Sequence, residues 1–167
     1  MHYTVRSTGL SLFTLVFMLT ALLHLACTRG QEQQGGKADA EAFTATLQKH
    51  LDAVSNKDLP SLESTLSPDG NMQLILPNRE ITNTVTEFVD MHRDWFQDTS
   101  WTFATKILNT EIGTSIGNAT TEIVYREPNR NGKPYFNRMA VSYTLKKSKN
   151  RWYVVKDHAC SLEKSAD

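Results

Sequence analysis

Apolar side chains recur at helical spacing in two parts of this chain. In the first part, the apolar positions lie three or four residues apart: Phe43, Leu47, Leu51 and Val54. This spacing predicts a helix over residues 40–56, and His50 falls on the same stripe. A second short helix is predicted to begin at Pro60, with Asp58 as its N-terminal cap.

A third helix has the clearest local signals. Thr84 and Glu87 match a capping box, in which the hydroxyl and the carboxylate each bind a free backbone donor. The face that follows consists of Val85, Phe88, Val89, His92, Trp95 and Phe96. This spacing is typical of an amphipathic helix, which is predicted to end near Gln97.

The rest of the folded region alternates apolar and polar residues, as strands do. One strand is predicted before the third helix, over residues 71–76. Four more strands follow it, with predicted ranges 101–108, 115–126, 135–147 and 151–161. A loop is expected over residues 128–134, with Asn131 and Gly132 at its tip. Together these elements predict an α+β fold, with three N-terminal helices packed on one face of a curved antiparallel sheet.

The first 27 residues resemble a bacterial export signal. An apolar run over residues 10–23 follows Arg6, which is the only charged residue among the first 28. Cys27 comes directly after Ala26, as in the lipobox of bacterial lipoproteins, where the signal peptidase cuts before a cysteine that then carries lipid. Two alternatives remain open, an ordinary secretory signal and an uncleaved membrane anchor.

The predicted domain boundaries follow from this signal. Residues 1–26 are assigned to the signal peptide, 27–38 to the lipidated cysteine and a flexible glycine-rich tether, 39–161 to the folded domain and 162–167 to a C-terminal tail. The expected location is the bacterial cell envelope. There the domain would face the periplasm and be held by lipid on Cys27, at the outer membrane if the host has one.

Charge and cysteine content restrict the partners. The chain has 18 Lys and Arg against 18 Asp and Glu and no basic cluster, so no nucleic-acid partner is expected. If Cys27 carries lipid, Cys160 has no intramolecular partner, and no disulfide holds the fold. The spacing of histidines and cysteines indicates no metal site, and no phosphate-binding loop or cofactor motif occurs.

Three segments, in this order, indicate a family. They are residues 47–59 (LQKHLDAVSNKDL), residues 66–70 (LSPDG) and residues 152–158 (WYVVKDH), the last followed by Ser161. The region over about residues 39–161 thereby resembles the nuclear transport factor 2-like (NTF2-like) superfamily, in its SnoaL-like and ketosteroid-isomerase-like branch. The resemblance implies a cone-shaped, cystatin-like α+β barrel with an apolar pocket between sheet and helices, commonly dimeric through the sheet.

The same resemblance argues against ketosteroid isomerase chemistry. The general base of those isomerases is an aspartate directly before the proline that ends the first strand, and the matching residue here is Leu76. Their oxyanion-binding tyrosine matches His50, and their protonated acid falls near Val141 or Ser142, where no carboxylate occurs. Because a leucine cannot accept a proton, this isomerase activity is not expected.

The candidate pocket residues are His92, His50, Trp95, Tyr143 and His158. His92 lies on an apolar stripe, so its imidazole is predicted to line an apolar cavity between the third helix and the sheet. The alternative for each histidine is a core side chain satisfied by one hydrogen bond. His158 alternates in step with Trp152 and Val154, which predicts that it faces an apolar environment and that Asp157 faces the other side.

Two main functions remain open at this point. The first is an envelope-anchored homodimeric domain that binds a small apolar molecule or an envelope protein and is not an enzyme. The alternative is a SnoaL-like enzyme in which His92 or His50 is the general acid or base. A purely structural dimerisation module is a third interpretation. The binding domain is favoured because the sequence shows no matched pair of acid and base residues.

Overall fold

The computed structural model describes residues 36–78 and 80–166. The predicted signal peptide, Cys27 and most of the predicted tether lie outside these residues. The chain divides into two compact units, residues 1–39 and 40–167, and the fold described below is that of the second unit.

All three predicted helices are present. They are the first helix at residues 36–56, α2 (Leu59–Glu63) and α3 (Val85–Trp95). The first helix includes residues 36–38, which the sequence analysis assigned to the tether. Asp58 caps α2 by accepting a hydrogen bond from the backbone N–H of Ser61 at 3.0 Å. At the start of α3, the predicted capping box of Thr84 and Glu87 is confirmed.

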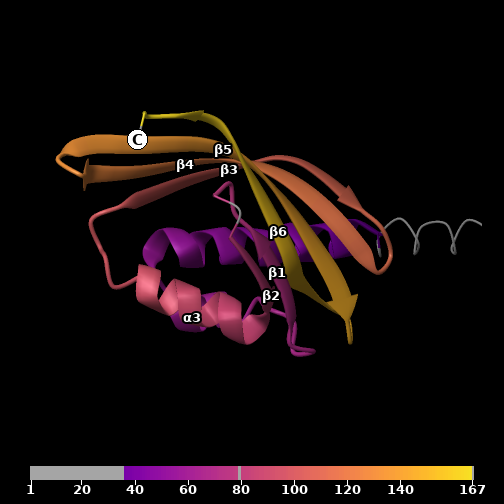
Figure 1. Ribbon diagram of the computed structural model, residues 1–167. Helices are drawn as coiled ribbons and strands as arrows, with labels where there is room; N and C mark the ends of the chain where they lie inside the picture. Colours follow the sequence, from indigo (N-terminus) through magenta and orange to yellow (C-terminus); the bar gives the residue numbers. More distant parts are fainter. Residues whose placement is uncertain (1–35, 79, 167) are drawn as a thin grey trace, which may run out of the picture. The chain divides into compact units, whose positions relative to one another are not determined.

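Six strands form one sheet: β1 (Asn71–Ile75), β2 (Ile81–Thr84), β3 (Thr102–Ile112), β4 (Ile116–Arg130), β5 (Lys133–Ser148) and β6 (Arg151–Lys164). Their order across the sheet is β2-β1-β6-β5-β4-β3. Neighbouring strands are antiparallel except for β1 and β6, which are parallel. Figure 1 shows the sheet curving over the helices, so the predicted α+β architecture is confirmed.

Three details of the sheet differ from the prediction. The short strand β2 was not predicted, because its four residues show no alternation of apolar and polar side chains. The loop expected over residues 128–134 is a tight turn at Asn131 and Gly132, whose φ angles are 53° and 86°, and β4 and β5 continue up to it. Strand β6 runs to Lys164, so part of the predicted C-terminal tail is strand.

The hydrophobic core fills the space between the helices and the sheet. Phe43 of the first helix and Trp152 of β6 meet edge to face, with ring centroids 5.2 Å apart. The predicted alternation along β5 is confirmed, since Met139, Val141, Tyr143 and Leu145 are all buried. The aromatic and aliphatic residues of the three helices therefore pack on one face of the sheet.

A β-bulge in β6 decides which side chains face the helices. Thr144 pairs with Lys156 but Leu145 pairs with Val154, so Val155 is an extra residue on β6. The bulge shifts the alternation by one residue. Trp152 and Val154 are buried before it, and Asp157 and Ala159 are buried after it.

The bulge corrects the prediction for His158. This histidine was expected to face an apolar environment together with Trp152, but its side chain is exposed. Asp157 takes the inward position and is only 6% exposed. Asp157 and His158 do face opposite sides of the sheet, as predicted. However, Asp157 faces the interior and His158 faces outward, which is the reverse of the prediction.

Candidate functional site

A group of buried polar side chains lies between the helices and the sheet. It consists of His50, Thr82, His92, Tyr143 and Asp157, which we call the interior polar cluster. The first helix, α3 and three strands each contribute one member. Each member is less than 9% exposed. Buried polar groups are normally hydrogen-bonded, so the partners of each member are informative.

The tautomer of His50 follows from its hydrogen bonds. Its Nδ1 lies 2.8 Å from Oγ1 of Thr65, and that hydroxyl lies 2.6 Å from the carbonyl oxygen of Leu62. A carbonyl oxygen only accepts, so the single hydroxyl proton of Thr65 is donated to Leu62. The hydroxyl must then accept from His50, which places the ring proton on Nδ1. Nε2 of His50 therefore carries a lone pair, and it is buried without a hydrogen-bond partner.

His92 is held in the same way. Its Nδ1 lies 2.8 Å from the carbonyl oxygen of Phe88, so Nδ1 carries the proton and donates it. The imidazole and the Phe88 ring have centroids 4.0 Å apart, and the rings of Trp95 and Phe96 contact it edge to face. The neighbours of the His92 imidazole are therefore aromatic rings.

Both imidazoles are neutral near pH 7. Burial lowers the pKa of His50 to about 3, with the nearby His92 as a second cause. Burial also lowers the pKa of His92 to about 4, against the opposing effect of its hydrogen bond to Phe88. Desolvation penalises the charged form of each ring, and no carboxylate pairs with either ring among the described residues.

Asp157 is the carboxyl group that the sequence analysis did not place in the interior. Burial raises its pKa to about 8, so the protonated form predominates at neutral pH. Its Oδ1 is buried and has no hydrogen-bond partner. Asp157 is the cross-strand partner of Tyr143, and burial together with the nearby carboxyl group raises the pKa of that phenol well above its ordinary value.

Tyr143 connects Asp157 to His50. Its ring meets the His50 imidazole edge to face, with centroids 5.6 Å apart. Directly opposed residues in a sheet have Cβ atoms about 5 Å apart and share a face. The acid on β6 and the imidazole on the first helix are therefore both neighbours of one phenol ring.

Thr82 lies in the same row of the sheet. Leu74 on β1 pairs with Thr82 on one side and with Asp157 on the other. Opposed residues point to the same face, so Thr82 and Asp157 flank Leu74 on the side that faces the helices. The Thr82 hydroxyl is buried without a partner. Asn137 Oδ1 is the fourth such atom in the described part of the chain, and it lies toward the start of β5.

The structure brings together most of the predicted pocket residues. His50, His92 and Tyr143 belong to the interior polar cluster, and Trp95 contacts His92 while stacking on Trp101 with centroids 4.1 Å apart. His158 is not part of the group. The cavity predicted beside His92 stays a prediction.

Sequence reasoning missed Asp157 and Thr82. Asp157 lies beside Tyr143 and was not among the predicted pocket residues. Regular alternation counted from Trp152 placed this aspartate on the outer face. The sequence did contain one sign of a buried acid, which is an aspartate between the apolar residues of this strand. It could be interpreted correctly only with knowledge of the bulge at Val155. Thr82 belongs to a strand without a periodic pattern, so the sequence offered no signal for it.

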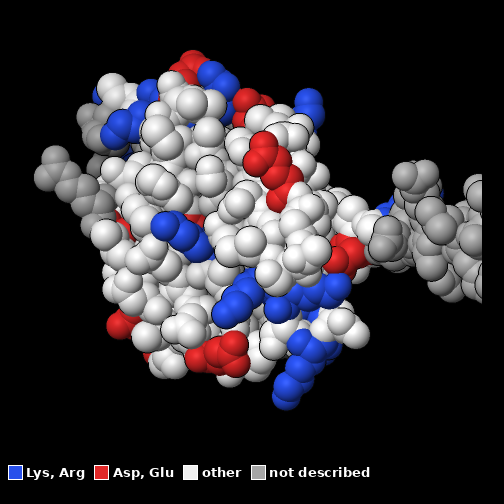
Figure 2. All heavy atoms as spheres, turned by 90° about the vertical axis from the view of Figure 1, so that its right-hand side faces the viewer, with Lys and Arg blue, Asp and Glu red and all other residues white. Residues whose placement is uncertain are grey.

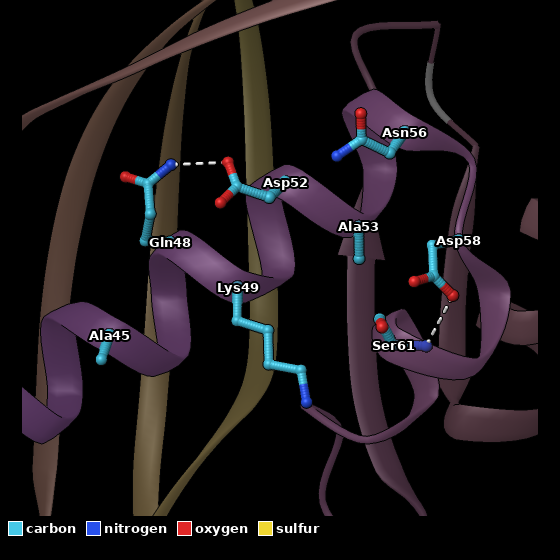
Figure 3. Close-up of a pocket in the computed structure, with 8 residues that line it drawn as sticks. All are labelled: Ala45, Gln48, Lys49, Asp52, Ala53, Asn56, Asp58 and Ser61. Carbon is cyan, nitrogen blue, oxygen red and sulfur yellow. Dashed lines mark hydrogen bonds between the residues drawn. The ribbon is translucent and has the colours of Figure 1, made fainter.

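A separate hollow of about 420 Å³ lies on the outer surface of the first helix and α2. Figure 3 shows its lining, which is Ala45, Gln48, Lys49, Asp52, Ala53, Asn56, Asp58 and Ser61. Gln48 donates to Asp52 at 2.8 Å, and Asp58 accepts from the Ser61 backbone. No member of the interior polar cluster lines this hollow, so it does not belong to the candidate site.

Two further structural findings concern metals and membranes. Within residues 36–78 and 80–166, no group of three His, Cys, Asp or Glu side chains is arranged to hold a metal ion. In the same ranges, no helix is both long and apolar enough to cross a membrane.

Solved structures share this fold at low sequence identity. A ketosteroid isomerase-like protein from Erwinia carotovora atroseptica is 16% identical with a TM-score of 0.63, and the match covers 74% of this chain and 95% of that chain. The association domain of Caenorhabditis elegans CaMKII is 21% identical with a TM-score of 0.55, covering 74% and 95%. A putative dehydratase of the NTF2-like family from Streptomyces avermitilis is 10% identical with a TM-score of 0.64, covering 75% and 97%.

The sequence comparison names the family. No curated protein sequence matches this chain. The family model of the SnoaL-like domain matches residues 44–162, which is most of the folded unit. At these identities the solved structures show the fold alone, and they agree with the family match. The chain therefore belongs to the SnoaL-like domain family.

Proposed function

We propose that this domain binds a small, largely apolar molecule between its helices and its sheet, with the interior polar cluster as the polar contact. One observation supports the proposal. Three buried polar atoms of the interior polar cluster have no partner: His50 Nε2, Thr82 Oγ1 and Asp157 Oδ1. Each such group costs about 1–3 kcal/mol of folding stability. A bound molecule would remove these costs by supplying the missing hydrogen bonds.

The charge state of the cluster restricts the ligand. With a pKa of about 3 for His50, about 4 for His92 and about 8 for Asp157, every titratable member is predominantly neutral at pH 7. A charged ligand would lose its hydration in this interior and find no opposite charge among these groups. The ligand is therefore expected to be uncharged.

Enzymatic catalysis by a histidine is the second candidate function. The lowered pKa values of His50 and His92 disfavour it. A general base is most effective when its pKa lies near the working pH. Bases with pKa values of about 3 and about 4 are weak proton acceptors at neutral pH. Any proton transfer in this site would be better served by Asp157, whose pKa of about 8 is nearer to neutrality.

The proposal includes a place for the domain in the cell. The export signal and lipobox pattern up to Cys27 support attachment to the bacterial envelope, with lipid as the membrane contact. The resemblance to dimeric members of the superfamily supports a homodimer. An envelope protein as partner is the alternative to a small molecule, and no residue of the interior polar cluster favours it, because these side chains are buried.

Native mass spectrometry of the full chain purified from its host tests the binding proposal. A small uncharged molecule is expected to travel with the folded protein and to be lost on unfolding. Asp157→Leu should reduce its occupancy, whereas His158→Ala, at an exposed position on the same strand, should not. The proposal fails if no molecule is retained and a high-resolution crystal structure shows only water at the three unpartnered atoms.

A further inference from the structure

We propose that the turn between β5 and β6 binds the headgroups of an anionic lipid surface, so that this end of the folded unit faces the membrane. The basic hairpin, as we call it, is residues 146–151, which include Lys146, Lys147, Lys149 and Arg151. The inference rests on the proposed attachment through Cys27 and adds a second membrane contact to it. It follows from the charge, the exposure and the position of the hairpin.

The charges of the chain are unevenly distributed along its sequence. The whole chain balances 18 basic against 18 acidic residues, but no Asp or Glu occurs between Glu127 and Asp157. The basic residues of that interval run from Arg130 to Lys156 and are densest in the basic hairpin. The sequence therefore does contain a basic cluster, which the balance over the whole chain concealed. Figure 2 shows Lys and Arg side chains gathered on the lower part of one face.

The basic side chains surround the tip of the hairpin. Lys146, Lys149 and Arg151 are exposed, and none of these three forms a salt bridge within the described residues. Successive side chains of a strand point to opposite faces, so Lys146 and Lys147 place their charges on both sides of the sheet. A flat anionic surface can meet charges on both sides only if it lies beyond the tip. The hairpin is therefore expected to approach a membrane end on.

The residue at the tip is informative. Lys149 and Asn150 form the turn with φ angles of 47° and 61°. Two-residue hairpin turns with positive φ favour Asn and Gly, because a larger side chain crowds the backbone in this conformation. Lysine at position 149 therefore costs local stability, and its charge is a property that Asn or Gly would lack. This is consistent with a charge that acts outside the fold.

An exposed apolar side chain lies beside the basic hairpin. Ile116 is 53% exposed, and it is the cross-strand partner of Lys146. The backbone N–H of Lys147 donates to the carbonyl oxygen of Ser115 at 2.8 Å, which holds the β3–β4 turn against the hairpin. Basic side chains next to an exposed apolar one fit the interface of an anionic bilayer, where headgroups meet hydrocarbon. A free phosphate ion or the backbone of a nucleic acid would offer Ile116 no apolar contact.

The hairpin lies at the end of the folded unit where the chain enters it. The unit begins at Ala40, and Phe43 packs edge to face on Trp152, with ring centroids 5.2 Å apart. Trp152 is in turn the cross-strand partner of Lys147. Figure 1 shows the start of the first helix and the β5–β6 turn on the same, right-hand side. An anchor that precedes Ala40 therefore pulls on the end of the unit that carries the basic hairpin.

The predicted anchor keeps the hairpin within reach of the membrane. Residues 28–39 separate Cys27 from the folded unit. A segment of that length spans at most about 40 Å even when it is fully extended. Short linkers of this kind give effective concentrations in roughly the millimolar range. A weak electrostatic contact is then sufficient to orient the domain.

Paramagnetic broadening of amide NMR signals tests the contact on the full chain. The protein is reconstituted into nanodiscs of phosphatidylcholine, with or without an equal part of phosphatidylglycerol, that contain a lipid with a gadolinium-chelating headgroup. In the anionic discs the signals of Lys149 and Asn150 should broaden, because gadolinium relaxes nearby nuclei. The signals of Asn131 and Gly132 should stay sharp, since β5 separates the two turns by about 50 Å. In neutral discs both turns should stay sharp.

A triple variant assigns the contact to the basic side chains. It combines Lys146→Gln, Lys149→Gln and Arg151→Gln. Each basic residue at an anionic surface strengthens association about fivefold, so the variant should dock about 100-fold more weakly and the broadening should disappear. The matched control loses the same charge at exposed positions on other elements, by Lys49→Gln, Lys106→Gln and Lys133→Gln. The control should leave the broadening unchanged, and an equal loss in both variants would overturn the assignment.

Salt separates this contact from the lipid anchor. Raising the salt concentration from about 0.1 M to about 1 M shortens the Debye length from about 10 Å to about 3 Å. The hairpin should then leave the anionic disc, while lipid on Cys27 retains the protein. Retention in both kinds of disc without broadening at the hairpin, or with equal broadening in neutral discs, would overturn this inference and leave the proposed attachment intact.

The remaining outcomes are also decisive. Retention only in anionic discs, reversed by salt, would support the hairpin contact and contradict lipid on Cys27. Failure of retention in both kinds of disc would count against both. Displacement from anionic discs by inorganic phosphate at constant ionic strength would make a free phosphate the ligand. Tighter binding of duplex DNA than of anionic discs would make a nucleic acid the partner, and either result would overturn the lipid surface.

Discussion

Asparagine in place of Asp157 should remove a large pH dependence of stability. In the folded protein burial raises the pKa of this carboxyl group to about 8, whereas an aspartate in an unfolded chain titrates near its ordinary value of 3.8. Between these values the folded state holds a proton that the unfolded state has released. Stability therefore falls as the pH rises. The contribution is largest below about pH 4 and is lost as the pH passes through about 8.

The magnitude follows from the number of pH units crossed. One proton of difference changes the free energy of unfolding by about 1.4 kcal/mol per pH unit. From pH 5 to pH 8 this amounts to about 4 kcal/mol, and little is added above pH 8. Asn at position 157 resembles the protonated acid in shape and cannot ionise. The stability of Asp157→Asn relative to the unmodified chain should rise by about 4 kcal/mol between pH 5 and pH 9.

The two buried histidines change stability with pH in the direction opposite to that of Asp157. Their pKa values are lowered to about 3 and about 4, so between these values and about 6.5 the unfolded state holds protons that the folded state lacks. Stability from His50 and His92 therefore increases as the pH rises and is fully present above about pH 6.5. Together with the fall caused by Asp157, this predicts maximum stability near pH 6.5 for the unmodified chain.

Urea unfolding at intervals from pH 5 to pH 9 measures these free energies. Asp94→Asn is the matched control, because it makes the same substitution at an exposed position on α3. Its stability relative to the unmodified chain should change little over the range. If the difference between Asp157→Asn and the unmodified chain is equally flat, Asp157 is not a buried neutral acid, and the argument for an uncharged site fails.

Three further results are expected. Trp152→Ala should lower the free energy of unfolding by about 3–5 kcal/mol, because the ring is buried against Phe43; normal melting would contradict this placement. Cys27→Ser should leave unprocessed precursor and abolish labelling by a fatty-acid analogue, and persistent labelling would refute the lipobox interpretation. A chain that begins at Asp39 should melt within a few degrees of one that begins at Thr28, since the omitted residues have no apolar periodicity, and a large loss of stability would show that they pack on the domain.

The sequence alone was sufficient to predict that the three helices exist and where along the chain they lie. Helical spacing and capping depend on residues within a few positions of one another, so the Thr84–Glu87 capping box and the stripe that contains His50 could be recognised without tertiary information. The long strand β5 was equally clear, because its alternation continues through Met139, Val141 and Tyr143. Ordered segments such as residues 152–158 also led to the SnoaL-like family, which the family match confirms.

The composition of the candidate site was decided only by the tertiary structure. The bulge at Val155 arises where β6 leaves regular pairing with β5, next to the hydrogen bond from Val154 to the Thr65 carbonyl. Thr65 is distant in sequence, and the shift in pairing with β5 leaves no mark in the periodicity of β6, so no local pattern reveals the extra residue. Because side chains alternate with a period of two, that one residue turned Asp157 inward and His158 outward. The periodicity of β6 could show that two neighbours face opposite sides, but only its pairing with β5 and β1 determined which of them is buried.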